Sequence, residues 1–173
     1  DLVDVMRQAV AEKGRLVYAV MRDAIKADEP ALFDAAAKRF LSLILLQDEL
    51  LATRPEFRVG TWIARARKLG VTPEEKDHYE WNARTLITTW GNREAANRGG
   101  LRDYAHREFY YKRWEMWVDR TSQALHQGEP LPSIDWYAVE EPWTKETKPY
   151  ASTAEGDPIE AARRAYRQIT TAE

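Results

Sequence analysis

Hydrophobic side chains recur with a helical period from the first residues of the chain. Over residues 2–27 the apolar positions return every three or four residues, which places them on one face of a helix. A second segment with the same period spans residues 30–53. Its first residue is a proline, which suits the first turn of a helix, and Asp28 or Glu29 stands near its cap. Because the joint is short, residues 1–53 are predicted to form a helical hairpin.

Cap and breaker residues divide the rest of the chain into further helices. Thr72, Pro73 and Glu75 form a strong start signal, because they supply a Thr cap, a proline at the first helical position and the Glu of a capping box. The helix that follows is expected to reach Trp90 or beyond, and Ser133 is expected to cap a later short helix. The other predicted helices are bounded by glycines, prolines and apolar spacing, at about 59–69, 101–127, 133–147 and 158–170.

No segment alternates between apolar and polar residues as a strand would. The sequence therefore predicts an all-α fold, an irregular bundle of six or seven helices. A length of 173 residues is enough for one domain with its own core, so residues 1–173 are interpreted as a single helical domain.

Composition excludes several classes of function. The 26 basic and 28 acidic residues are well mixed and leave a net charge of −2, so no basic stripe suits a nucleic acid. The longest apolar runs, such as residues 41–46, are too short to cross a bilayer, and no membrane partner is expected. The absence of cysteine excludes disulfides and thiol chemistry. No signal peptide is expected at the start, and position 1, which is not methionine, is expected to be a cut or processed end.

The stretch from Tyr79 to Trp117 holds four of the seven tryptophans and four of the eight tyrosines. Arginine and asparagine side chains are interleaved with these rings. Aromatic rings fill protein cores and also line sugar or peptide sites, because they combine a large apolar area with a polar group. The residues alone therefore leave open a stand-alone helical protein-interaction module with an aromatic binding face.

Short motifs in a fixed order along the chain resemble those of one enzyme family. They are Asp1-Leu2-Val3-Asp4-Val5 with Arg7-Gln8, residues 50–57, Trp62 with Ala66-Arg67, Tyr79-Glu80-Trp81-Asn82-Ala83-Arg84, Thr89-Trp90-Gly91, Asp103-Tyr104-Ala105, Arg113-Trp114, Glu141-Pro142-Trp143, Tyr150 and Gly156-Asp157-Pro158. In this order they resemble the C-terminal all-helical domain of family 89 glycoside hydrolases, the α-N-acetylglucosaminidases. The resemblance covers most of the chain.

The resemblance implies a function and a larger parent protein. Family 89 enzymes hydrolyse terminal α-linked N-acetylglucosamine with retention, and the resemblance places both catalytic glutamates in an upstream (β/α)8 barrel outside this chain. The chain is then expected to be a non-catalytic domain that packs on the barrel and completes the glycan pocket. The parent is expected to be secreted, periplasmic or lysosomal. The surface that the barrel covers is expected to expose an apolar patch at Leu2, Val3, Met6 and the 90–104 edge.

Two groups of residues are expected to have specific roles, the first of them by the resemblance. Trp90, Leu101 and Tyr104 are expected to form a wall of the sugar pocket, where an aromatic face meets the sugar ring and the Tyr hydroxyl reaches a sugar oxygen. Burial of the same side chains in the core is the alternative. The second group, of structural or interface residues, consists of Arg84, Asp103 and Arg113. The arginines lie amid aromatic residues and are expected to be buried, stacked on tryptophan and bonded to carboxylates and helix-end carbonyls, with contact to the barrel or a substrate as the alternative.

One junction departs from the family pattern. At Glu108-Phe109 about seven residues, close to two helical turns, are missing relative to the pattern. Either the helix is shortened in phase, so that residues 102–118 form one unbroken helix, or a stretch of chain is absent between the two residues.

No catalytic carboxylate pair, metal or cofactor is predicted for this chain. Retaining hydrolysis needs two carboxylates about 5–5.5 Å apart. The acids within residues 74–80, Glu80 included, are instead interpreted as helix-start residues that stabilise the dipole. The adjacent pair Glu140-Glu141 points apart on a helix. The i, i+3 pairs Glu75/His78 and Asp103/His106 have the spacing of di-metal bundles, but no facing pair of glutamates accompanies them.

Overall fold

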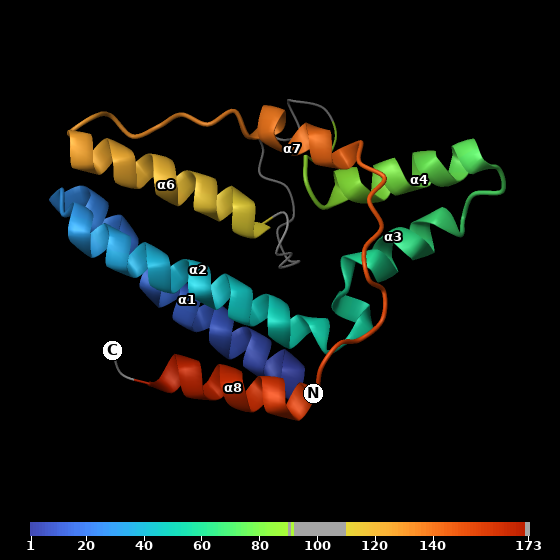
Figure 1. Ribbon diagram of the computed structural model, residues 1–173, viewed down its shortest axis with the longest axis horizontal. Coiled ribbons are helices and arrows are strands. Elements are labelled where there is room, and N and C mark those ends of the chain that lie inside the picture. Colours follow the sequence, from blue (N-terminus) through green and yellow to red (C-terminus); the bar gives the residue numbers. More distant parts are fainter. Residues whose placement is uncertain (90, 92–109, 172–173) are drawn as a thin grey trace. The chain divides into compact units, whose positions relative to one another are not determined.

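The computed structural model describes residues 1–89, 91 and 110–171. Within these residues every regular element is a helix, which confirms the predicted all-α fold (Figure 1). The elements are α1 (Leu2–Ala27), α2 (Pro30–Ala52), the 3-10 helix η1 (Pro55–Phe57), α3 (Val59–Arg67), α4 (Pro73–Leu86), α6 (Lys112–Gln127), α7 (Trp136–Thr144) and α8 (Pro158–Thr170). None of the helices in this part of the chain is long and apolar enough to cross a membrane.

Local start signals place three helices where the sequence predicts them. Pro30, Pro73 and Pro158 open α2, α4 and α8 in the first turn. The Thr72 hydroxyl accepts a hydrogen bond from the Glu75 backbone N–H at 3.2 Å, and the Glu75 carboxylate accepts one from the Thr72 backbone N–H at 3.2 Å. The predicted capping box is therefore confirmed.

The α4 helix ends at Leu86, so the prediction that it reaches Trp90 is wrong. The Ile87 N–H bonds the Arg84 carbonyl at 3.3 Å, only three residues back, which tightens the last turn. The Thr88 hydroxyl donates to the same carbonyl at 2.8 Å. A threonine that competes for helix carbonyls in this way favours the end of a helix over its interior.

The α7 helix begins at Trp136 and ends at Thr144, so the predicted limits of 133 and 147 are too wide at both ends. The cap is Asp135, whose carboxylate accepts a hydrogen bond from the Ala138 N–H at 3.2 Å, and not Ser133. Aspartate is at least as good a cap as serine, and it stands directly before the first helical residue. Of the helix predicted over 101–127, the structure describes only residues 110–127, which contain α6.

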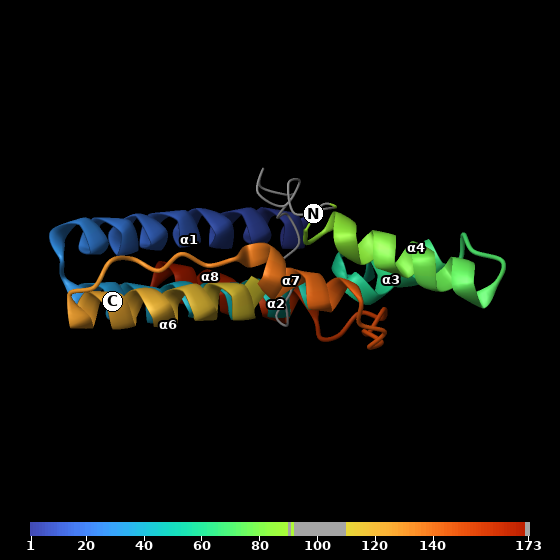
Figure 2. The ribbon, with the colours of Figure 1, turned by 90° about the horizontal axis from the view of Figure 1, so that it is seen from above.

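Contacts between helices divide the chain into two compact units. Unit 1 comprises residues 1–53, 105–133 and 156–173, and unit 2 comprises residues 54–104 and 134–155. In unit 1, α1 and α2 form the predicted hairpin, with α6 against α2 and α8 against both hairpin helices (Figure 2). In unit 2, α4 contacts both α3 and α7. The prediction of a single helical domain stays a prediction.

Aromatic rings form much of the core of unit 1. Phe40 and Trp114 lie with ring centroids 4.8 Å apart at 72°, and Trp114 meets Trp117 at 5.6 Å and 89°. Tyr18 contacts both tryptophans, and Phe33 packs edge-on against Trp117. These edge-to-face contacts are a favoured geometry for aromatic pairs. Two tryptophans of the aromatic stretch thus serve the core of unit 1.

The apolar patch expected near the start of the chain is largely absent. Val3 and Met6 are 1% and 7% exposed, whereas Leu2 is 50% exposed. Val3, Met6 and Val10 share the stripe of α1 that faces the interior, because they recur at helical spacing, and Leu2 lies off that stripe. The expectation is therefore wrong for Val3 and Met6.

Candidate functional site

The structure describes only part of the set of site residues that the sequence singles out. The predicted pocket wall and its neighbours lie outside the described residues: Trp90, Leu101, Asp103, Tyr104 and the Glu108-Phe109 junction. Arg113 lies in the first turn of α6, in unit 1, and is partly buried. Arg84 lies in the last turn of α4, in unit 2, and organises the most elaborate polar cluster among the described residues.

Arg84 is fully buried and bonded along its guanidinium edge. Its Nε and Nη2 donate to Glu80 Oε1 at 2.9 and 2.7 Å, one helical turn back on α4. Nη2 also donates to the carbonyl oxygen of Lys148 at 2.8 Å. The arginine thus ties α4 to the segment that follows α7.

Two aromatic rings enclose the same guanidinium. Its central carbon lies 4.8 Å from the Trp143 ring centroid and 5.3 Å from that of Tyr150. Trp143 Nε1 donates to the Tyr150 hydroxyl at 2.9 Å, which fixes the two rings relative to each other. In a desolvated site such cation–π contacts are worth about 2 kcal/mol. We call Arg84, Glu80, Trp143 and Tyr150 the Arg84 cluster.

Glu80 provides the negative charge of the cluster and is only 6% exposed. Its second oxygen accepts a hydrogen bond from Arg67 Nη1 at 2.6 Å, and the same nitrogen donates to Asp77 Oδ1 at 2.8 Å. These bonds to Asp77 and Glu80 raise the pKa of Arg67 above its usual value. Because α4 begins at Pro73, Glu80 lies nearly two turns inside the helix, and its interpretation as a helix-start acid is wrong.

Glu75, by contrast, does act at the helix start. Its carboxylate accepts hydrogen bonds from the backbone N–H groups of Val71 and Thr72 at 2.7 and 3.2 Å, and these bonds lower the pKa of Glu75. The Glu75 carboxylate, which the i, i+3 spacing pairs with His78 as a possible metal ligand, is thus hydrogen-bonded to the backbone. Over the described residues, no group of three or more histidine, aspartate or glutamate side chains could hold a metal ion. Asp103 and His106 lie outside those residues.

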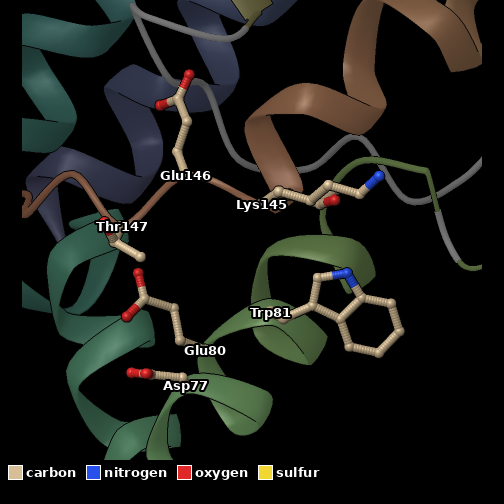
Figure 3. A pocket seen from close by; sticks show the side chains of 7 residues that line it. Asp77, Glu80, Trp81, Lys145, Glu146 and Thr147 are labelled. Carbon is tan, nitrogen blue, oxygen red and sulfur yellow. The ribbon is translucent and has the colours of Figure 1, made fainter.

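A small pocket of about 220 Å³ adjoins the Arg84 cluster within unit 2 (Figure 3). Its described lining comes from α4 and from the end of α7 with the residues that follow: Asp77, Glu80, Trp81, Thr144, Lys145, Glu146 and Thr147. Figure 3 shows the Glu80 carboxylate directed toward Thr147. Trp81 and Lys145 lie to the right of these two residues in this view. The volume is below that of typical sites for drug-sized ligands, so it suits a single small ring.

Sequence patterns do not identify most of the residues that make up the Arg84 cluster. The i, i+4 spacing of Glu80 and Arg84 is a helical ion-pair signal that could have identified their bond. Lys148, however, is 64 residues away from Arg84 along the chain and contributes a backbone carbonyl, which no side-chain pattern reveals. Trp143 and Tyr150 appear in the sequence only as isolated aromatic motifs.

Comparisons with known proteins agree with the motifs found along the sequence. The family model of the alpha-N-acetylglucosaminidase (NAGLU) C-terminal domain matches residues 1–168. Human alpha-N-acetylglucosaminidase is 29% identical over 178 aligned residues, which cover 96% of this chain and 23% of the human protein.

Solved structures of a bacterial enzyme are also similar to this chain. CpGH89 from Clostridium perfringens, solved in complex with its substrate GlcNAc-alpha-1,4-galactose, is 35% identical with a TM-score of 0.84, over 95% of this chain and 20% of that one. A family 89 glycoside hydrolase from the same organism in complex with PUGNAc is 35% identical with a TM-score of 0.83, over 96% of this chain and 20% of that one.

The chain spans about a fifth of the length of these relatives. The family match covers nearly all of it, and the resemblance stated from the motifs is confirmed. The chain belongs to the family of alpha-N-acetylglucosaminidase C-terminal domains, a part of family 89 glycoside hydrolases.

Proposed function

We propose that this chain is a non-catalytic domain that packs on a (β/α)8 barrel of the same parent protein and completes the pocket for terminal α-linked N-acetylglucosamine. One observation carries the proposal: the chain matches a fifth of a bacterial enzyme solved with GlcNAc-alpha-1,4-galactose as its substrate. Retaining hydrolysis requires a pair of carboxylates. The buried Glu80 is already bound by two arginines, which supports a catalytic pair elsewhere in the parent.

In this proposal Trp90, Leu101 and Tyr104 form one wall of the pocket. An indole or phenol face suits the apolar face of a pyranose ring, and a tyrosine hydroxyl can bond a sugar oxygen. Leu101 excludes water beside the ring. The wall supplies binding and orientation, while the acid and the nucleophile belong to the barrel.

Arg84 is a positioning residue in this proposal. Trp90 follows Leu86, the last residue of α4, by only four positions. The direction in which the chain leaves α4 therefore depends on the turn that contains Arg84. A guanidinium bonded to Glu80 and to a distant carbonyl fixes that turn better than apolar packing alone, because hydrogen bonds set orientation as well as distance.

The test is the hydrolysis of an aryl α-N-acetylglucosaminide by the full-length parent protein. Trp90→Ala and Tyr104→Phe are each expected to lower kcat/KM about fivefold to tenfold, because one stacking contact or hydrogen bond in a closed site is worth about 1–1.5 kcal/mol. The control is Tyr166→Ala, which changes an exposed aromatic residue on α8 and is expected to leave kcat/KM unchanged.

Two outcomes would overturn the proposal. One is that Trp90→Ala and Tyr104→Phe both retain full kcat/KM. The other is hydrolysis by the purified 173-residue chain alone that disappears when one of its own acids is changed. An open reading frame without a barrel would favour the alternative of a stand-alone interaction module.

A further inference from the structure

Three of the four charged side chains that line the pocket in unit 2 have partners of opposite charge, and the fourth, Glu146, is exposed to solvent. Asp77 and Glu80 both bind Arg67 Nη1, at 2.8 and 2.6 Å. Lys145 Nζ lies 2.9 Å from Glu141 Oε1. Because these charges are paired, a ligand does not need a charge of its own to offset them.

The groups that stay available in the pocket are an aromatic surface and hydrogen-bonding atoms. Trp81 is 42% exposed although it lines the pocket. The exposed Thr147 hydroxyl can both donate and accept, and a carboxylate such as that of Asp77 has about four acceptor positions, more than one arginine uses. An indole surface beside mixed donors and acceptors matches a ring that has an apolar face and hydroxyl groups on its edge.

We propose that this pocket binds one neutral sugar unit, in addition to any sugar bound at the wall formed by Trp90, Leu101 and Tyr104. The ring lies against Trp81, and its hydroxyl groups bond Asp77 and Thr147. A volume of about 220 Å³ is enough for a single ring. The inference goes beyond the proposed function and does not rest on it, because all of its residues belong to the described part of unit 2.

The main competing ligand is an organic cation. An indole attracts ammonium groups through its π face, and the lining contains three carboxylates. Asp77 and Glu80 are bonded to Arg67, so a cation would meet that positive charge close by, and the third carboxylate, Glu146, is exposed to solvent. The geometry therefore favours a neutral ligand, and the two classes can be separated with simple probes.

The experiment is fluorine NMR of the full-length parent protein labelled with 5-fluorotryptophan. Trp81→Phe removes one resonance and thereby assigns it. Titration with N-acetylglucosamine and with galactose is expected to shift the Trp81 resonance saturably, with a Kd in the millimolar range, about 1–10 mM for so small a site. Thr147→Val, which keeps the shape and removes the hydroxyl, is expected to weaken binding about threefold to tenfold.

The matched control is Thr153→Val, an exposed threonine in the same segment that is not among the described lining residues. It is expected to leave the sugar affinity unchanged, and thermal unfolding checks that both valine variants are folded. A Trp81 resonance that neither sugar moves overturns the proposal, and so does one that tetramethylammonium or magnesium moves while the sugars do not. Loss of hydrolysis on changing Trp90 or Tyr104 tests the proposed function separately, because the Trp81 signal does not depend on catalysis.

Discussion

The interiors of the two units are stabilised by different kinds of interaction. Unit 1 packs aliphatic and aromatic side chains between long helices, and ion pairs such as Arg164–Glu49 lie on its surface. Unit 2 has shorter helices, and its best-connected buried residue is a charged one, Arg84. Burial of apolar area is spread over many contacts that can relax, whereas a buried ion pair leaves an unpaired charge when one partner is lost. Unit 2 is therefore expected to respond more sharply to single substitutions.

The largest effect is expected from Arg84→Met. Methionine fills a similar volume but leaves the buried carboxylate of Glu80 without its α4 partner, which is expected to cost about 3–5 kcal/mol of unfolding free energy. Arg164→Met, which removes an exposed partner of Glu49 in unit 1, is expected to cost less than about 1 kcal/mol. Chemical denaturation of both variants measures the difference.

A double variant sharpens that comparison. If the cost of Arg84→Met comes from the stranded carboxylate, then adding Glu80→Leu removes the charge and is expected to recover part of the loss. A double variant whose cost equals the sum of the two single costs would contradict this explanation and would point to lost packing against Trp143 and Tyr150.

The same substitution is expected to have opposite signs in the two units. In unit 2, a Cβ on Gly60 would overlap the carbonyl oxygens of Tyr150 and Ala151, so Gly60→Ala is expected to destabilise by about 1–3 kcal/mol. In unit 1, a Cβ on Gly14 would lie 4.0 Å from Phe40, so Gly14→Ala is expected to stabilise α1 by about 0.5–1 kcal/mol. Thermal unfolding of the two variants measures both signs, and two shifts in the same direction would refute the comparison.

A smaller effect is expected at the start of α4. Thr72→Ala removes the hydroxyl that accepts the Glu75 N–H and is expected to cost about 1 kcal/mol. Thr72→Ser keeps the hydroxyl and is expected to retain most of the stability. Equal losses in the two variants, measured by denaturant unfolding, would show that the cap contributes little.

The smallest effect is a dependence on pH. Hydrogen bonds from the Val71 and Thr72 N–H groups lower the pKa of Glu75 from its ordinary value of 4.5. The stability they contribute is therefore present above that ordinary value and is lost as the pH falls through the lowered, folded-state value. Glu75→Gln is expected to remove this part of the acid destabilisation. The unfolding free energies of the variant and of the unsubstituted chain should converge as the pH falls through this acidic range. A constant difference between them would exclude the contribution.

The two units also differ in how well the sequence predicts their structure. The hairpin of unit 1 follows from apolar spacing and from Pro30, because both are local signals that later packing reinforces. The sequence predicts the end of α4 at too late a position, because the competition of the Thr88 hydroxyl for a helix carbonyl is weak in isolation and depends on the surrounding fold. Local patterns therefore predict the helices better than their ends.

The candidate site was less predictable than the fold. Arg84 stands out in the sequence because of its aromatic neighbours. Only Glu80 among its partners is close along the chain, whereas Trp143, Tyr150 and the Lys148 carbonyl lie about 60 residues or more away. The pattern of side chains along the sequence does not predict such contacts, because these contacts depend on which distant segments the fold brings together. The prediction that Trp90, Leu101 and Tyr104 form a pocket wall follows from the family resemblance. It is tested by the kcat/KM of the full-length variants.

The rest of unit 2 contacts the segment after α7 largely through main-chain atoms, and Tyr150 adds a side chain that joins the Arg84 cluster. Arg84 donates to the carbonyl of Lys148, Thr61 donates to that of Ser152 at 2.9 Å, and Gly60 leaves room for those of Tyr150 and Ala151. Natural variation should follow from this: homologous proteins are expected to keep Tyr150 and the number of residues along 148–153 but to exchange many of the other side chains there. Insertions in this segment should be rare even where its sequence has diverged, and they should occur together with the loss of Gly60 or Arg84.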